Sequence, residues 1–171
     1  MVTIRKKKLG DEQQIQTVIE RAFGRTEEAD IVDKLRQSCP NSISLVAISN
    51  DQIVGHILFT PVTIQAKKRI IIGMGLGPMA VIPELQRQGI GSQLVKAGLE
   101  LVKKTKYPFA IVLGHPEYYP RFGFVPSSRY SIRSEYENVP DEAFMILVLD
   151  KEVLKGISGV AKYRHEFAEA I

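Results

Sequence analysis

Apolar residues near the start of the chain recur three and four positions apart, which predicts two consecutive helices. The first runs through Ile15–Phe23, with Asp11 as its expected N-cap and Gly24 as its stop. The second is expected over Glu27–Gln37. Residues Val2–Leu9, ahead of both helices, alternate between apolar and polar and predict a first strand.

Alternating stretches farther along predict a hairpin. Strands are expected over Ile43–Ser49 and Gln52–Gln65, and Asn50 and Asp51 form the tight turn between them. Pro61, inside the second strand, cannot donate a hydrogen bond, so it predicts an edge position or a bulge.

A long third strand is expected over Ile70–Ile82. Its Gly73, Gly75 and Gly77 recur at every second position, so they share one face of the strand. We expect them to leave a bare strip that a ligand or another backbone can approach closely. Pro78 predicts that strand pairing is broken or bulged at this point.

The second half of the chain predicts one long helix and several short strands. Apolar residues over Ile90–Val102 recur at helical spacing, and Pro108 ends the pattern. His115–Phe122 predicts a short helix or turn, and the polar segment Pro126–Asp141 predicts a loop. Further strands are expected at Phe109–Leu113, Phe144–Leu149 and Val160–Tyr163. This order of elements predicts a mixed α/β sheet with a strand–loop–helix unit at its centre.

Composition narrows the class of protein. The chain has 171 residues, 44% of them hydrophobic and 25% charged, which suits one globular domain over residues 1–171. It has no apolar run of about 18 residues and no apolar leader, so neither a membrane span nor a membrane partner is expected. Cys39 is the single cysteine, which excludes an internal disulfide and favours a reducing, cytoplasmic location.

Charge adds an expected type of ligand. The net charge of +4 and the isoelectric point near 9.2 favour an anionic ligand or partner. The densest basic run, Arg5–Lys8, is interpreted as a solvated edge strand, not a nucleic-acid contact, because no aromatic residues interleave with it. His56, His115 and His165 are scattered along the chain, so no metal site is expected.

The segment Gln86–Gly91 (QRQGIG) follows an apolar strand and leads into the long helix, which makes it a candidate anion site. Loop amides, the positive end of the helix and a glycine that lets a phosphate approach the backbone combine there. The segment lacks the glycine-lysine-serine or -threonine ending of a P-loop. The glycines of Gly73–Gly77 lie inside a strand, where a dinucleotide-binding turn does not occur.

Three segments together resemble the Gcn5-related N-acetyltransferase (GNAT) family. Gln86–Gly91 matches the family's Q/R-x-x-G-x-G/A loop, and Leu76–Val81 (LGPMAV) resembles its cofactor-binding strand. Tyr118–Phe124 (YYPRFGF) resembles its Tyr-x-x-x-Gly-Phe segment. The matches cover a cofactor core over about residues 70–125, whereas residues 126–171 are similar, more loosely, to a bacterial subgroup of uncharacterised acetyltransferases.

The resemblance implies a fold and a co-substrate. The fold is an α/β (α+β) one, a mixed, mostly antiparallel central sheet flanked by helices, whose central strand splays from its neighbour near Pro78. The co-substrate is acetyl-coenzyme A, whose pantetheine amides would pair with Met79 and Val81 while its pyrophosphate lies on the loop. The residues implied in cofactor binding are Met79, Ala80, Val81, Gln86, Arg87, Gln88, Gly89, Ile90, Gly91 and Ser92.

The resemblance also implies catalytic residues. Tyr119 stands at the position of the family's general-acid tyrosine, where a phenol (pKa about 10) protonates a departing thiolate (thiol pKa about 8.5). The adjacent Tyr118 is the alternative acid. Some members carry a glutamate base on the cofactor strand, but Ile70–Ile82 contains none, and His115 is the first candidate instead. The remaining candidates for the base are a water relay, His56, Glu84 and Glu117.

These features predict an enzyme that moves an acetyl group from acetyl-coenzyme A to a primary amine of a small-molecule or protein acceptor. The amine would attack directly in a ternary complex. A non-catalytic domain that binds or senses acyl-coenzyme A is the alternative, and a basic nucleic-acid-binding module rests on charge alone. Acceptor specificity would lie in Gly24–Pro40 and Pro126–Asp141, and an exposed edge strand leaves room for a homodimer.

Overall fold

The structure is a computed structural model that describes the backbone of residues 1–170 and the side chains of residues 1–168. The chain forms two compact units. The first comprises residues 1–60, 77–101 and the C-terminal residues from His165, and the second comprises residues 61–76 and 102–164. The expectation of a single domain stays a prediction.

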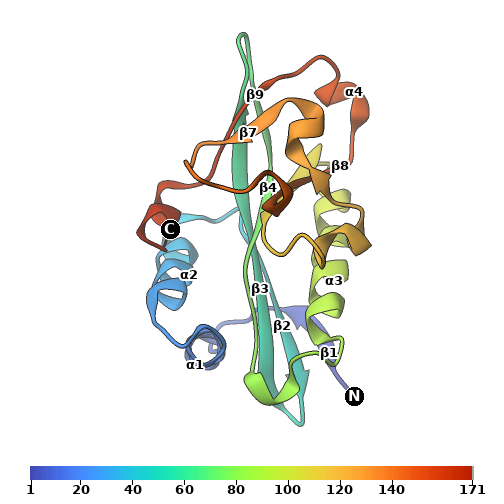
Figure 1. Cartoon of the computed structure of the whole chain (residues 1–171). Coiled ribbons are helices and arrows are strands. Elements are labelled where there is room, and N and C mark those ends of the chain that lie inside the picture. Colours follow the sequence, from blue (N-terminus) through green and yellow to red (C-terminus); the bar gives the residue numbers. More distant parts are fainter. Residues whose placement is uncertain (171) are drawn as a thin grey trace. The chain divides into compact units, whose positions relative to one another are not determined.

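Three elements run from one unit into the other (Figure 1). They are strand β3 (Gln52–Gln65), strand β4 (Ile70–Val81) and helix α3 (Ile90–Lys104). No helix in the described residues is long and apolar enough to cross a membrane.

The first unit is a short antiparallel sheet with helices on both faces. Strand β2 pairs with β1 and with β3, both antiparallel. The elements that lie wholly in this unit are β1 (Thr3–Lys6), α1 (Glu12–Phe23), α2 (Glu27–Ser38), β2 (Ile43–Ser49), the 3-10 turn η1 (Pro83–Leu85) and the 3-10 helix η5 (His165–Ala170).

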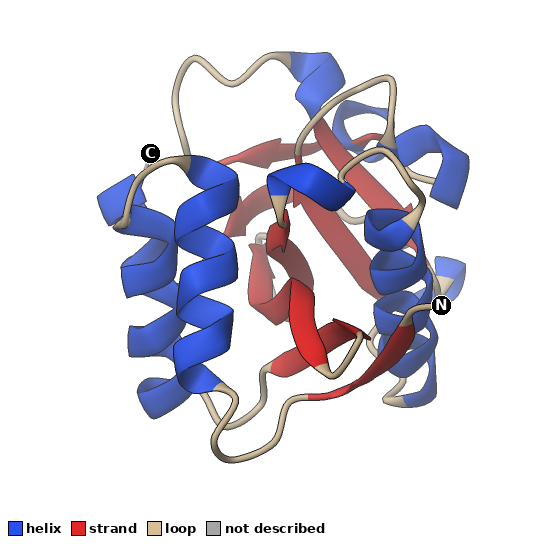
Figure 2. Ribbon diagram, turned by 90° about the horizontal axis from the view of Figure 1, so that it is seen from below, coloured by secondary structure: helices blue, strands red, loops and turns tan. Residues whose placement is uncertain are grey.

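Helices α1 and α2 cover one face of these strands, and α3 covers the other (Figure 2). Ile15 and Ile19 of α1 and Leu35 of α2 belong to one buried apolar cluster with Leu58 and Ala80 of the strands. On the opposite face, glycine lets α3 approach the sheet closely. A Cβ on Gly98 would overlap the ring of Phe59, and one on Gly55 would lie 3.1 Å from Leu94.

The second unit contains short strands that pair mostly antiparallel. The β5–β8, β6–β8 and β3–β9 pairs are antiparallel, whereas the β4–β5 and β7–β9 pairs are parallel. Its own elements are β5 (Phe109–Leu113), η2 (Tyr119–Phe122), β6 (Val125–Pro126), η3 (Ser127–Tyr130), β7 (Ile132–Ser134), η4 (Asp141–Ala143), β8 (Phe144–Val148), α4 (Lys151–Leu154) and β9 (Gly159–Lys162). The expected mixed, mostly antiparallel sheet flanked by helices is therefore confirmed.

Asp11 holds the N-cap position of α1, as expected, but its carboxylate accepts no hydrogen bond from the first turn of the helix, because it binds Arg5 and the Lys8 amide instead. Two local expectations were wrong. The first strand is shorter than Val2–Leu9. The expected loop Pro126–Asp141 contains β7 and the 3-10 turn η3, which the polar sequence did not indicate.

The expected bare strip on β4 is filled at two of its three glycines. A Cβ on Gly73 would lie 2.6 Å from the ring of Phe109, and one on Gly75 would lie 2.6 Å from Val62. These glycines make room for core side chains of the second unit. Gly77 alone has open space around its Cα and a φ of 136°.

Candidate functional site

The segment between β4 and α3 has the backbone geometry of an anion nest. Arg87 and Gly89 have φ values of 63° and 89°, and Gln88 between them is on the ordinary negative side. Alternation between left- and right-handed residues turns successive N–H groups toward one point, where they can surround an anion. The long helix α3 begins directly afterwards, at Ile90, and adds the positive end of its dipole.

The amides of this loop are unused within the described part of the chain. No backbone acceptor is found for the N–H groups of Arg87, Gln88, Gly89, Ile90 or Gly91. The first helical hydrogen bond is donated by Gln93 to the Gly89 carbonyl, at 3.1 Å. Consecutive unpaired amides at a helix start are the groups that bind phosphate in proteins.

Two glutamine side chains hold the loop in place by hydrogen bonds to backbone carbonyls. Gln86 Nε2 donates to the Val81 carbonyl at 2.8 Å, and Gln88 Nε2 donates to the Glu84 carbonyl at 3.3 Å. The two glutamines thereby tie the loop to the end of β4 and to η1. Arg87 is exposed and makes no hydrogen bond or ion pair with any described residue, so its guanidinium is available to an anion.

The expected pantetheine-binding residues lie at the end of β4. Met79 is half-buried, whereas Ala80 and Val81 are buried, Ala80 in the cluster beneath α1 and α2. The parallel ladder between β4 and β5 covers Met74 to Leu76 and ends there. The peptide that follows, Gly77–Pro78, is cis.

In the second unit, Tyr119 sits at the start of η2 with its ring packed among aromatic side chains. The ring centroids of Tyr118 and Phe124 lie 5.0 and 5.9 Å away, both edge-on. Only 7% of Tyr119 is exposed, and its backbone N–H donates to the His115 carbonyl at 3.4 Å. Burial, and secondarily Tyr118, raise the pKa of Tyr119 to about 12, so the phenol stays protonated at neutral pH.

Two neighbours of the tyrosines have roles that the sequence did not reveal. Gly114, at the end of β5, leaves the space that the Tyr119 ring occupies, because an added Cβ would overlap that ring. Arg121 lies over the Tyr118 ring, 4.4 Å from its centroid, and its Nε donates to the Tyr118 carbonyl at 2.9 Å. The only local signals were a glycine after a strand and an arginine inside the aromatic segment.

Of the candidate bases, His56 is enclosed in the first unit. Its side chain is fully buried, with Nε2 2.8 Å from Ser44 Oγ. Burial, with a smaller effect from Lys7, lowers the pKa of His56 to about 3. A general base needs contact with its substrate or with water, and a side chain with no exposed surface has neither.

The other candidates are exposed. Glu84 forms an ion pair with Arg21, and its own backbone amide and then Arg21 lower its pKa, which makes it a weaker base. His115 and Glu117 have 83% and 78% of their side chains exposed, with His115 Nδ1 4.0 Å from Glu117 Oε1. His115 thus contacts the tyrosine turn through its backbone carbonyl, while its imidazole faces solvent.

The described side chains contain no cluster of His, Cys, Asp and Glu that could hold a metal ion. The described residues offer two chemical features, an anion nest in the first unit and a buried phenol in the second. Each belongs to a segment that the sequence singled out.

Comparisons with known proteins point to one family. A family model described as an acetyltransferase (GNAT) domain matches residues 3–127. The uncharacterised N-acetyltransferase YhbS of Escherichia coli K12 is 30% identical over 154 residues, which are 90% of each chain.

Two solved structures agree with this match. The crystal structure of YhbS from Escherichia coli in complex with coenzyme A has a TM-score of 0.89 at 28% identity, covering 98% of this chain and 92% of that one. A GNAT acetyltransferase from Brucella melitensis in complex with acetyl-coenzyme A has a TM-score of 0.77 at 30% identity, covering 98% of both chains.

Proposed function

Since the chain belongs to the GNAT acetyltransferase family, we propose that it transfers the acetyl group of acetyl-coenzyme A to a primary amine. The observation that carries this proposal is the run of unpaired amides from Arg87 to Gly91 at the start of α3. A pyrophosphate is the part of acetyl-coenzyme A that such a nest fits. Two similar proteins hold coenzyme A or acetyl-coenzyme A in their crystals.

In this proposal the co-substrate lies along the end of β4. Its pyrophosphate accepts hydrogen bonds from the loop amides of Gln88–Ser92, and Arg87 adds a positive charge. Its pantetheine amides pair with the backbone of Met79 and Val81, since the ladder with β5 ends before them, at Leu76. One Val81 carbonyl lone pair is already used by Gln86, which leaves the second for the ligand.

The proposed reaction is direct attack in a ternary complex. A neutral amine adds to the thioester carbonyl, the tetrahedral intermediate collapses, the C–S bond breaks and coenzyme A leaves as the thiolate. Tyr119 donates a hydrogen bond to that sulfur as negative charge develops. Because burial makes this phenol a weaker acid than a thiol of pKa about 8.5, Tyr119 keeps its proton and stabilises the leaving thiolate by this hydrogen bond. The attacking nitrogen loses its proton to the base, and the departed thiolate takes up a proton from solvent.

The base in this proposal acts on the ammonium form of the acceptor. His115 remains the first candidate, because its backbone already contacts the Tyr119 turn, and a water relay is the alternative. His56 is withdrawn, because its imidazole is sealed in the core.

A non-catalytic domain that binds acyl-coenzyme A is the second candidate function. One specific observation favours it, namely the absence of any carboxylate between Ile70 and Ile82. Such a domain would bind acetyl-coenzyme A and turn over no amine.

The test compares Tyr119→Phe with Tyr118→Phe, which removes a hydroxyl from the adjacent ring. Release of coenzyme A would be measured over a panel of amines, and acetyl-coenzyme A binding by calorimetry. We expect Tyr119→Phe to lower kcat about 10² to 10⁴-fold, with the Kd unchanged and Tyr118→Phe close to wild type.

Other outcomes separate the alternatives. An unchanged kcat in Tyr119→Phe would remove this residue from the mechanism, and a loss in Tyr118→Phe alone would exchange the two roles. Tight binding without turnover of any amine would establish the non-catalytic domain instead.

A further inference from the structure

The second unit contains a cavity of about 520 Å³ that the proposed function does not use. Its lining includes three exposed basic residues, Arg129, Lys151 and Lys155, here called the rim. It also includes three apolar or aromatic residues that are buried or half-buried, Tyr130, Leu154 and Ile157, here called the floor. None of these residues belongs to the loop Gln86–Gly91 or to η2, which contains Tyr119. The volume lies within the range of about 300 to 1,000 Å³ that is usual for small-molecule sites.

The charge of this cavity is unbalanced. Glu152 is the one acidic residue among those that line it, against the three basic ones. No ion pair of Arg129, Lys151 or Lys155 is found with a described residue, so no described carboxylate neutralises their charges. A cavity with unpaired cations around its rim attracts anions.

Neutral donors add to this preference. Gly156 and Ser158 line the cavity, and their backbone N–H groups have no acceptor among the described residues. Ser131 and Ser158, which also line it, carry hydroxyl groups. Amides and hydroxyls of this kind fix the orientation of a carboxylate or phosphate.

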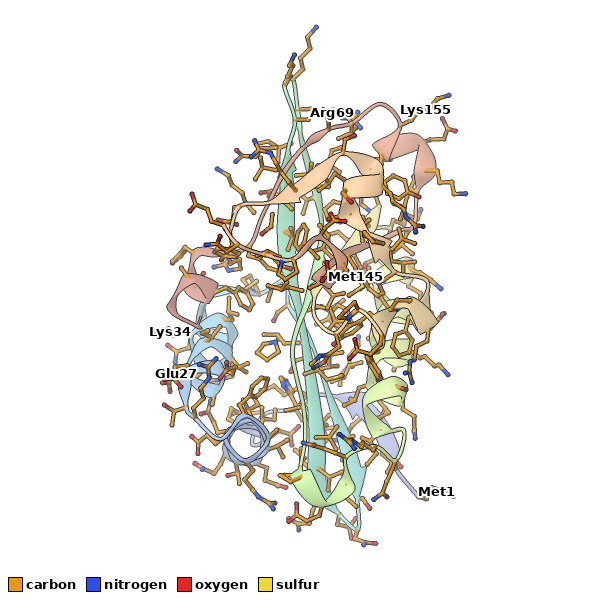
Figure 3. All side chains as sticks on the ribbon, in the orientation of Figure 1. Met1, Glu27, Lys34, Arg69, Met145 and Lys155 are labelled. Atoms are coloured by element: carbon orange, nitrogen blue, oxygen red, sulfur yellow. The ribbon has the colours of Figure 1, made fainter. Side chains whose placement is uncertain are left out.

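Hydrogen bonds hold several of the segments that line the cavity or flank it. The Asp150 carboxylate accepts from the amides of Glu152 and Val153 at 3.1 and 3.3 Å, which fixes the start of α4. The Gly159 amide donates to the Ser131 carbonyl at 3.1 Å, where β7 and β9 pair. Arg69, on the turn between β3 and β4, donates to the Val153 carbonyl, and Figure 3 shows it in the same part of the unit as Lys155.

We propose that this cavity binds a small organic anion, with a carboxylate or phosphate on the basic rim and an apolar or aromatic body on the floor. The rim supplies the charge that selects an anion over a neutral compound. The floor of Tyr130, Leu154 and Ile157 favours a ligand that carries apolar surface. The site is separate from the cofactor nest and does not depend on acetyl transfer.

The test is a titration of the full chain, labelled with ¹⁵N, by phenyl phosphate and by benzoate. Benzyl alcohol serves as the neutral probe. We expect saturable shifts of the Ser131, Gly156 and Ser158 amide signals with both anions, and an affinity that falls as sodium chloride is raised. The anion that binds with the higher affinity identifies the preferred head group, phosphate or carboxylate.

Variants locate the binding. Replacement of Arg129, Lys151 and Lys155 by Gln is expected to weaken binding at least tenfold, and each single replacement to weaken it in part. Lys96→Gln, an exposed lysine on α3, is the matched control and should bind as wild type does. If the triple variant does not fold, the partial loss of affinity in the single variants still tests the assignment.

Three results would overturn the proposal. If benzyl alcohol bound as tightly as the anions, the cavity would not select for charge. If the amide shifts caused by the anions did not saturate, there would be no specific binding site. Displacement of the bound anion by coenzyme A would assign the cavity to the cofactor. Loss of acetyl transfer in Tyr119→Phe leaves all of these readouts unaffected, so the two proposals fail independently.

Discussion

At the scale of single residues, His56 is a polar side chain in an environment that does not suit its charged form. Its ring is fully buried on β3, with a hydrogen bond between Nε2 and Ser44 Oγ and no partner for Nδ1 among the described residues. The neutral imidazole is tolerated there, but the imidazolium would be a desolvated charge. That difference lowers the pKa of His56 to about 3 and links folding to pH.

We expect His56 to make the protein less stable as the pH falls. An unfolded histidine takes up its proton near pH 6.5, whereas the folded one resists until about pH 3. Its contribution is therefore complete above pH 6.5 and is lost below it, by about 1.4 kcal/mol per pH unit. His56→Gln, which keeps an amide near Ser44, should show a smaller loss in urea unfolding between pH 6 and pH 4. Parallel curves for the two proteins would contradict this assignment.

Residues of the basic N-terminal run are used inside the fold. Arg5 binds the Asp11 carboxylate at 2.7 and 3.1 Å, and Lys7 lies 2.9 Å from Glu12. The hydrogen bond from Arg5 is the main reason why the pKa of Asp11 lies below its ordinary value. The sequence indicated an exposed basic run and a capping aspartate, but the pairing of one with the other depends on how β1 meets α1.

At the scale of elements, the loop before α3 depends on a glycine. Gly89 has a φ of 89° and open space around its Cα, so an alanine there would meet no atom but would strain the backbone. Gly10 has a φ of 99° and equally open surroundings, outside the loop. The two glycines form a matched pair that separates backbone strain from loss of a binding surface.

We expect Gly89→Ala and Gly10→Ala to cost similar stability, about 1 to 2 kcal/mol each. Gly89→Ala alone should weaken acetyl-coenzyme A binding, about tenfold or more, because its relaxation turns the nest amides away from a common point. Chemical unfolding and calorimetry measure the two effects. Equal affinity in both variants would mean that the Gly89 conformation does not organise the cofactor site.

Elements whose pattern is local were predictable from the sequence. The strands at Gln52–Gln65 and Phe109–Leu113 and the stop of α1 at Gly24 are confirmed. Strand β7 was missed because its pairing with β9 joins segments distant in the sequence, such as Ile132 and Gly159. The motif Gln86–Gly91 was enough to predict an anion-binding loop before α3. The contact between Gly114 and the Tyr119 ring could not be predicted, because it depends on how the two segments pack.

At the scale of the whole molecule, the end of the chain helps to close the first unit. The short helix η5 packs on α2, where the Ser38 hydroxyl donates to Glu166 at 2.8 Å. Phe167 packs against the apolar cluster beneath α1 and α2. The C-terminal residues are therefore part of the core of the first unit, and shortening the chain before η5 would expose that cluster.

The continuity of β3, β4 and α3 through both units leads to an expectation about cooperativity. A strand cannot unfold in one unit without losing its support in the other, so we expect a single unfolding transition. Acetyl-coenzyme A at about 100 times its Kd should then raise the stability of both units by about 2.7 kcal/mol, although its proposed nest lies in the first. Hydrogen exchange of the buried amides of Val46 and Ile111, one from each unit, measures this directly. Protection that rises at Val46 alone would show two units that open independently, and it would overturn the expectation of a single domain.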